Sequence, residues 1–260
     1  MAYADLRFET DGPLATITLN RETRLNALGK TLVEELVDVV GRLERDPDVR
    51  VVILTGAGRA FCAGADIKER AENPDDFSLQ RTSSLMSPTF RRFERLKQVV
   101  IAAMNGVAAG GGLELAMACD FRIASSEVKV AMPEVKLGIL PGAGGTQRLP
   151  RLIGAPRAKR MMFFGDFIEA AQAEEWGILD KVVAPEALMD EARLWAERLL
   201  AMAPLSIASI KSAVNVGMDT DLDSGIEYEQ RCSTIVAMSE DRREGYRAFV
   251  EKRPPQFQGR

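Results

Sequence analysis

Short apolar runs alternate with stretches of helical spacing along the first two thirds of this chain, and this alternation most limits the folds open to it. Residues 51–54 (VVIL) form an apolar run too short for a helix and β-branched enough for a strand buried on both faces. Residues 99–104 repeat that pattern, while residues 33–43 and 90–96 show helical spacing. Such alternation is typical of βαβ units, so we predict an α/β fold.

The rest of the chain extends this prediction. Residues 113–118 predict a short helix and residues 121–124 a strand, which adds another β-α-β step. The polar stretch 68–80 is expected to cross the surface. From about Pro150 the pattern is helical almost throughout, best in 187–203 and 204–216, so we place the change from core to helical region between residues 149 and 184.

The composition excludes several kinds of chemistry. The chain has 260 residues and no histidine, which excludes histidine-based nucleophile activation, imidazole metal sites and histidine acid–base catalysis. Catalysis must use carboxylates, lysine, tyrosine, cysteine or backbone amides. The net charge of -4 gives no overall attraction to nucleic acid or to an anionic membrane. Three scattered cysteines and a start without a signal-peptide pattern predict a cytoplasmic or a matured organelle protein.

Two glycine-rich stretches are each expected just beyond the end of a buried parallel strand. They are residues 61–67 (FCAGADI) and 110–114 (GGGLE). Open α/β sheets bind their ligands at that edge, and small residues let a ligand approach the main chain. Free N–H groups at such a position can stabilise a carbonyl oxygen that becomes negative, as in an oxyanion hole. Neither a dinucleotide fingerprint nor a P-loop is complete in the chain.

Two glutamates accompany these stretches. Glu114 follows the second glycine run at once, and Glu134 lies in residues 132–138 (MPEVKLG) beyond the next predicted strand. Taken alone, Glu114 is typical of a helix start and Glu134 of a surface turn. Two carboxyls in one pocket repel each other, so one holds its proton more easily, which suits paired acid and base roles.

A third glycine-rich stretch, residues 138–149 (GILPGAGGTQRL), lacks the lysine of a P-loop, so we interpret it as a connector that shapes the pocket floor. Near the end of the chain, Phe249 and Lys252 share one face of a predicted helix. By themselves they indicate only a lysine lying over an aromatic ring.

In order along the chain, these stretches resemble the enoyl-CoA hydratase/isomerase (crotonase) superfamily: residues 61–68, 110–116, Pro133-Glu134 and 138–149. The resemblance extends from about Leu6 to Gly245. It implies a spiral of ββα units in residues 1–195 and a helical trimerisation region in residues 196–260. It also implies an acyl-CoA thioester substrate, a homotrimer or a hexamer built as a dimer of trimers, and no membrane association.

The resemblance further implies roles for individual residues. The oxyanion hole would consist of the backbone N–H groups of Ala65 and Gly111, and catalysis would rest on Glu114 and Glu134. The coenzyme A part of the substrate would be bound by Ala63, Asp66, Ile67, Lys68, Phe249 and Lys252. No metal or separate cofactor is implied. Phe249 and Lys252 match positions that reach a coenzyme A held largely by a neighbouring subunit.

Both glutamates are kept, which favours an enoyl-CoA hydratase of the fatty-acid β-oxidation type, adding water to a trans-2-enoyl-CoA. Alternatives remain an enoyl-CoA isomerase and a branched-chain hydratase of the methylglutaconyl-CoA type. Some branched-chain members also bind RNA through a lysine-rich helix. Residues 69–76 here hold as much acid as base, which does not favour nucleic-acid binding. The sequence does not indicate the length of the substrate's acyl chain.

Overall fold

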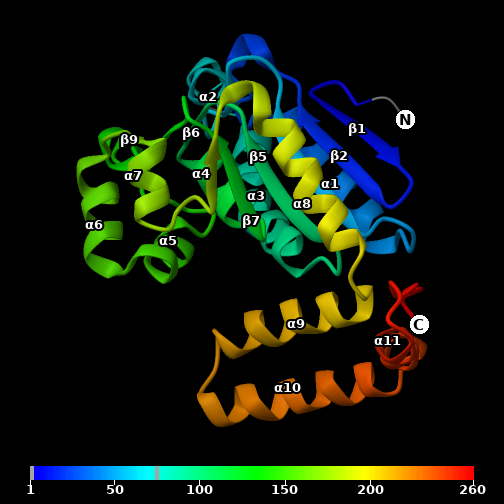
Figure 1. Cartoon of the computed structure of the whole chain (residues 1–260). Coiled ribbons are helices and arrows are strands. Elements are labelled where there is room, and N and C mark those ends of the chain that lie inside the picture. Colours follow the sequence, from blue (N-terminus) through cyan, green and yellow to red (C-terminus); the bar gives the residue numbers. More distant parts are fainter. Residues whose placement is uncertain (1–2, 74–75) are drawn as a thin grey trace.

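Two sheets form the centre of this computed structural model, which describes residues 3–73 and 76–260 (Figure 1). The larger sheet has six strands, in spatial order β1 (Leu6–Asp11), β2 (Leu14–Leu19), β3 (Val51–Gly56), β5 (Val99–Met104), β7 (Phe121–Ser125) and β10 (Lys181–Val183). The smaller sheet has four, β4 (Ala60–Cys62), β6 (Val107–Ala109), β8 (Lys129–Ala131) and β9 (Ile168–Glu169). Strand β1 is antiparallel to β2 and β9 to β8, and the other neighbouring pairs are parallel.

Helices occupy most of the remaining described chain. The α-helices are α1 (Lys30–Arg45), α2 (Ile67–Glu72), α3 (Phe77–Arg95), α4 (Gly111–Met117), α5 (Gly145–Ile153), α6 (Ala155–Phe164), α7 (Ala170–Glu175), α8 (Leu188–Leu200), α9 (Pro204–Gly217), α10 (Leu222–Ala237) and α11 (Glu240–Glu251). Short 3-10 helices are η1 (Glu22–Arg24), η2 (Glu134–Leu137) and η3 (Pro185–Ala187).

From β3 to α5 the chain repeats one step three times. In each step one strand joins the larger sheet, the next strand joins the smaller sheet, and helical segments follow. The steps are β3–β4 with α2 and α3, β5–β6 with α4, and β7–β8 with η2 and α5. This arrangement confirms the α/β class and the spiral of ββα units.

The core lies on both faces of the larger sheet, as the apolar run at residues 51–54 predicts. Val52 and Leu54 of β3 belong to the cluster that holds the buried faces of α1 and α3. Val51 and Ile53 point to the other face and pack with Ala192 of α8. Figure 1 shows α8, in yellow, lying across that face of the sheet.

The last three α-helices extend away from the two sheets (Figure 1). Helix α8 is buried against the core through Ala196, and the expected division at residues 195/196 falls within this helix. Helix α9 is joined to the core by Lys211, whose ammonium group donates to the carbonyl of Gln98 (2.9 Å) and to Asp120 (2.7 Å). No single described helix is long and apolar enough to cross a membrane, and residues 185–200 and 204–217 pass that test only as a pair bent by 105°.

The polar stretch 68–80 lies mostly at the surface, as expected, and much of it belongs to two helices, α2 and α3. Helix α2 begins there because the Asp66 carboxylate accepts the backbone N–H of Glu69 (3.0 Å) and caps its first turn. Helix α3 begins at Phe77, and its Leu79 is buried. Residues 74 and 75 lie outside the described part of the chain.

Candidate active site

The loops of the candidate site follow three neighbouring parallel strands of the smaller sheet. Ala65 comes after β4, Gly111 after β6 and Glu134 after β8. Because the carboxyl ends of parallel strands meet at one edge, these residues are brought together. The sequence predicts a buried parallel strand before each of the two glycine-rich loops, and β4 and β6 are parallel and largely buried. Each loop follows a three-residue strand of the smaller sheet.

The backbone N–H groups of Ala65 and Gly111 are unengaged. Leu28 bridges this loop by donating to the carbonyl of Gly64 (2.7 Å) and accepting from the N–H of Asp66 (3.3 Å), which leaves the N–H of Ala65 between them without an acceptor. Gly111 is the first residue of α4, where an N–H has no partner within the helix. Neither group donates to another described residue. A Cβ built on Gly111 would lie 3.7 Å from the Ala65 nitrogen, so the two donors are neighbours.

Glu114, in the first turn of α4, is held by backbone donors from one side. Its side chain is buried, and Oε1 accepts from the N–H of Ala143 (2.8 Å) and of Gly145 (2.7 Å). Burial raises the pKa of Glu114, while these two bonds and the charge of Arg148 act against that rise. Within the described chain, Oε2 accepts no hydrogen bond. One oxygen is therefore fixed and the other is open to a ligand.

Glu134, at the start of η2, is buried and has few hydrogen-bond donors around its carboxyl group. Its Oε2 has no hydrogen-bond partner among the described residues. Burial raises the pKa of Glu134 to about 7, and the charge of Glu114 adds to the rise. Oε1 lies against Gly110, where a Cβ would stand 3.0 Å from it, so this position requires glycine at φ +50°.

These features place the two carboxyls near each other. Both carboxyls meet at the start of α4, because Glu114 donates its own N–H to the carbonyl of Gly110 (2.9 Å) and Glu134 packs against that glycine. Burial raises the pKa of both acids, and the charge of Glu114 adds to the rise at Glu134, which suits Glu134 to give a proton while Glu114 takes one. Among the described residues, no group of three or more Cys, Asp or Glu side chains is placed to hold a metal ion.

Comparison with known proteins identifies the family. Residues 9–260 match the family described as enoyl-CoA hydratase/isomerase. This chain belongs to the enoyl-CoA hydratase/isomerase family. It is 42% identical to a crotonyl-CoA hydratase of Syntrophomonas wolfei over 99% of both chains, and 43% identical to a short-chain-enoyl-CoA hydratase of Clostridium acetobutylicum over 97% of both. The crystal structure of an enoyl-CoA hydratase from Bacillus anthracis superposes with a TM-score of 0.95 at 41% identity, covering 99% of this chain and 100% of that one.

The coenzyme A residues that the family resemblance implies on the first loop differ in how they are presented. Ala63 is partly exposed, while Ile67 and Lys68 are exposed. Asp66 is buried, since its carboxylate caps α2 and forms an ion pair with Arg21 (3.1 Å). The Asp66 side chain is thus engaged within the protein. Of the four residues, Ala63, Ile67 and Lys68 are the ones that a ligand can reach from solvent.

Phe249 and Lys252 are not brought to this site within one chain. Both lie at the end of α11, and Phe249 is 86% exposed. Figure 1 shows α11 well away from α4 and the smaller sheet. The structure of a single chain therefore does not place Phe249 and Lys252 beside Glu114 and Glu134.

The sequence analysis missed the residues that hold Glu114. It interpreted residues 138–149 as a connector, whereas the N–H groups of Ala143 and Gly145 bind the carboxylate directly. Gly144 between them has φ +110°, and a Cβ there would overlap the guanidinium of Arg148. Alternating glycines just before a helix were the available signal, because that pattern frees N–H groups for an anion.

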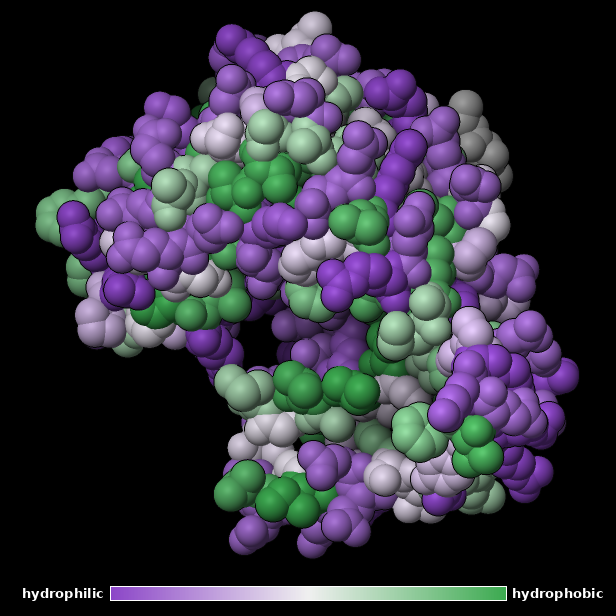
Figure 2. Space-filling model, in the orientation of Figure 1, coloured by the Kyte–Doolittle hydropathy of each residue, from purple (hydrophilic) through white to green (hydrophobic). Residues whose placement is uncertain are grey.

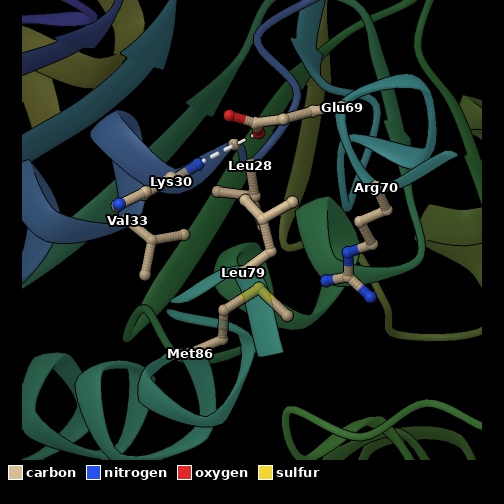
Figure 3. Close-up of a pocket in the computed structure, with 8 residues that line it drawn as sticks. Leu28, Lys30, Val33, Glu69, Arg70, Leu79 and Met86 are labelled. Carbon is tan, nitrogen blue, oxygen red and sulfur yellow. Dashed lines mark hydrogen bonds between the residues drawn. The ribbon is translucent and has the colours of Figure 1, made fainter. Parts of the chain in front are cut away.

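A small pocket lined by both charged and apolar side chains lies next to Leu28 (Figure 3). Its volume is about 10 Å³, room for a single water molecule. The lining residues are Leu28, Gly29, Lys30, Val33, Glu69, Arg70, Leu79 and Met86. Leu28 also contacts the Gly111 position, where a Cβ would lie 3.1 Å from its Cδ1. The pocket thus joins α1 and α3 to the predicted thioester site.

Proposed function

We propose that this family member is an enoyl-CoA hydratase that adds water reversibly to trans-2-enoyl-CoA and gives 3-hydroxyacyl-CoA. One observation carries the proposal: two buried carboxyls, each with an oxygen that accepts no hydrogen bond from a described residue, lie beside two backbone N–H groups that donate to no described residue. The names of the relatives at 42% and 43% identity favour a short acyl chain such as crotonyl.

The proposed mechanism uses these four groups together. The N–H groups of Ala65 and Gly111 bind the thioester oxygen and stabilise the negative charge that forms on it. Glu114 accepts a proton from a water molecule as the water oxygen bonds to C3. The electrons of the C2–C3 double bond move toward the thioester oxygen, and Glu134 donates its proton to C2. A pKa of about 7 lets Glu134 carry that proton near neutral pH.

Substitution of either glutamate tests this assignment. We expect Glu114→Gln and Glu134→Gln each to lower kcat for crotonyl-CoA hydration by about 10²-fold or more, because each removes one proton transfer. Loss of crotonyl-CoA absorbance measures the rate. Glu127→Gln, at an exposed glutamate in the turn before β8, is the matched control and should keep wild-type turnover. Near-normal turnover in either site variant would remove the acid–base assignment.

Double-bond isomerisation is the second candidate, favoured by the near-neutral pKa of Glu134, which suits a group that both gives and takes a proton. Incubation with 3-enoyl-CoA and with 2-enoyl-CoA in heavy water separates the two reactions. A hydratase makes 3-hydroxyacyl-CoA from the 2-enoyl substrate, whereas an isomerase converts the 3-enoyl substrate without adding water.

We further propose assembly as a homotrimer or as a hexamer of two trimers, with a neighbouring copy bringing Phe249 and Lys252 to the bound coenzyme A. The exposure of both α11 positions supports this arrangement. We propose the cytoplasm as the working compartment, with a matured mitochondrial protein as the alternative. Free, buried Cys62, Cys119 and Cys232 fit a reducing compartment. β-Oxidation is the proposed pathway.

A further inference from the structure

An ion pair between α5 and α3 lies behind the loop that holds Glu114. Arg148 of α5 contacts Glu94 of α3, with its Nη2 2.8 Å from Oε2 and its Nε 3.5 Å from Oε1. The arginine side chain is 14% exposed and the glutamate side chain 36%. No step of the proposed mechanism uses either residue.

Arg148 connects this pair to the catalytic carboxylate through the main chain. Its Nη1 donates to the carbonyl of Ala143 (3.0 Å), and the N–H of the same residue donates to Glu114 Oε1 (2.8 Å). The Arg148 guanidinium can reach the Ala143 carbonyl because Gly144 has no side chain, since a Cβ there would overlap the guanidinium. The arginine therefore fixes the turn that supplies both backbone donors to Glu114.

The charges around Glu114 come from three elements. The charge of Glu114 raises the pKa of Glu134 of η2, whereas Arg148 of α5 lowers the pKa of Glu114 against the effect of burial. Glu94 of α3 lies behind the arginine and orients its planar fork. Among the charged side chains of the described elements packed around Glu114, Arg148 is the positive one that acts on its pKa.

The pair also borders the space between the core and α9. Arg148, Glu94, Lys211 and Asn215 line a groove of about 1140 Å³, and Figure 2 shows this hollow with hydrophilic residues behind it. The amide of Asn215 donates to the backbone carbonyl of Glu94 (3.1 Å). The position of α9 is thus connected through hydrogen bonds to the turn at residues 143–145.

We propose that Arg148, oriented by Glu94, is a positioning residue for the hydration reaction: it fixes the turn at residues 143–145 and so holds the Glu114 carboxylate aimed at the water. This inference rests on the proposed function. Arg148 itself does not touch the substrate. Replacing Arg148 should therefore change kcat rather than the binding of coenzyme A.

The test compares pH profiles of crotonyl-CoA hydration by the full-length protein. In Arg148→Met we expect kcat to fall about 10-fold or more with KM little changed, and the acidic limb of kcat/KM to move to higher pH by about half a unit or more. Arg148→Lys keeps the charge and should restore much of the acidic limb but only part of kcat, because lysine lacks the planar fork. Arg151→Met, one turn further along α5, is the matched control and should match the wild type.

Glu94→Gln keeps the shape of the side chain and provides a test if Arg148→Met does not fold, as judged by circular dichroism. We expect a smaller loss of kcat at unchanged KM. Wild-type kcat and acidic limb in both Arg148→Lys and Glu94→Gln would overturn the positioning role. A wild-type protein that does not hydrate crotonyl-CoA would instead overturn the proposed function, so the two failures are distinguishable.

Discussion

At the scale of single residues, the sequence indicates which groups are present but not how they are held. The two glutamates and the two glycine-rich loops are recognisable from their order along the chain. The two backbone donors to Glu114 are not recognisable in this way, because they come from Ala143 and Gly145, 29 and 31 positions away. The unpartnered Oε2 of Glu134 is equally invisible before folding, since burial depends on the whole chain.

This buried acid makes stability depend on pH. The folded-state pKa of Glu134 is raised from 4.5 to about 7, so the folded protein binds more protons than the unfolded chain between those values. Stability therefore falls as pH rises from about 4.5 to about 7. We expect Glu134→Gln to melt above the wild type at pH 8 and to lose most of that advantage at pH 4.5.

Thermal melts of the wild type, Glu134→Gln and the exposed-site control Glu127→Gln at both pH values measure the effect. The control should follow the wild type throughout. An advantage of Glu134→Gln that is the same at pH 4.5 and pH 8 would show that ionisation is not its cause.

At the scale of elements, long strands and helices are predictable and very short ones are not. The apolar runs of β3 and β5 and the periods of α1 and α9 mark their elements clearly. Strands β4, β6 and β8 have three residues each, too few to show a period of two, although they carry the whole site. Helix α2 depends on the cap from Asp66, which the sequence analysis did not use.

The contact of α4 with β4 gives a prediction at this scale. A Cβ on Gly112 would overlap the carbonyl oxygen of Cys62, a backbone atom that cannot rotate away. We expect Gly112→Ala to displace α4, to lower the melting temperature and to weaken turnover, because Gly111 and Glu114 lie on the same helix. Gly217→Ala, at the end of α9 with nothing within 4 Å, should leave activity unchanged.

Thermal melts followed by circular dichroism and crotonyl-CoA turnover of the two glycine variants test this prediction. A Gly112→Ala protein as stable and active as Gly217→Ala would mean that α4 tolerates a shift away from β4.

At the scale of the whole molecule, the C-terminal helices leave apolar side chains uncovered. On α9, Ile210 is 63% exposed and Val214, one turn later, is 57% exposed. The side chains share a face, and a contiguous apolar face of this kind indicates a contact between proteins. The sequence predicts these helices but not that they extend away from the core, since helical spacing alone does not reveal the partner.

We expect the wild-type chain of 28.5 kDa to sediment at three or six times that mass. The double variant Ile210→Glu, Val214→Glu places charges on the exposed face of α9 and should sediment as a lighter species. Glu9→Lys, on the exposed side of β1, is the control and should keep the wild-type mass. A wild-type monomer, or a double variant of unchanged mass, would contradict the proposed assembly through α9.

The three-step spiral separates two tasks. The N–H groups that would bind the thioester oxygen come from the first and second steps of the spiral. The acid that would protonate C2 comes from the third step. The segment after β8 also reaches back to the second step, because Glu134 packs against Gly110 and the N–H groups of Ala143 and Gly145 hold Glu114. A substitution in this segment therefore acts on both proton transfers, although it leaves the residues that carry the two amide donors unchanged.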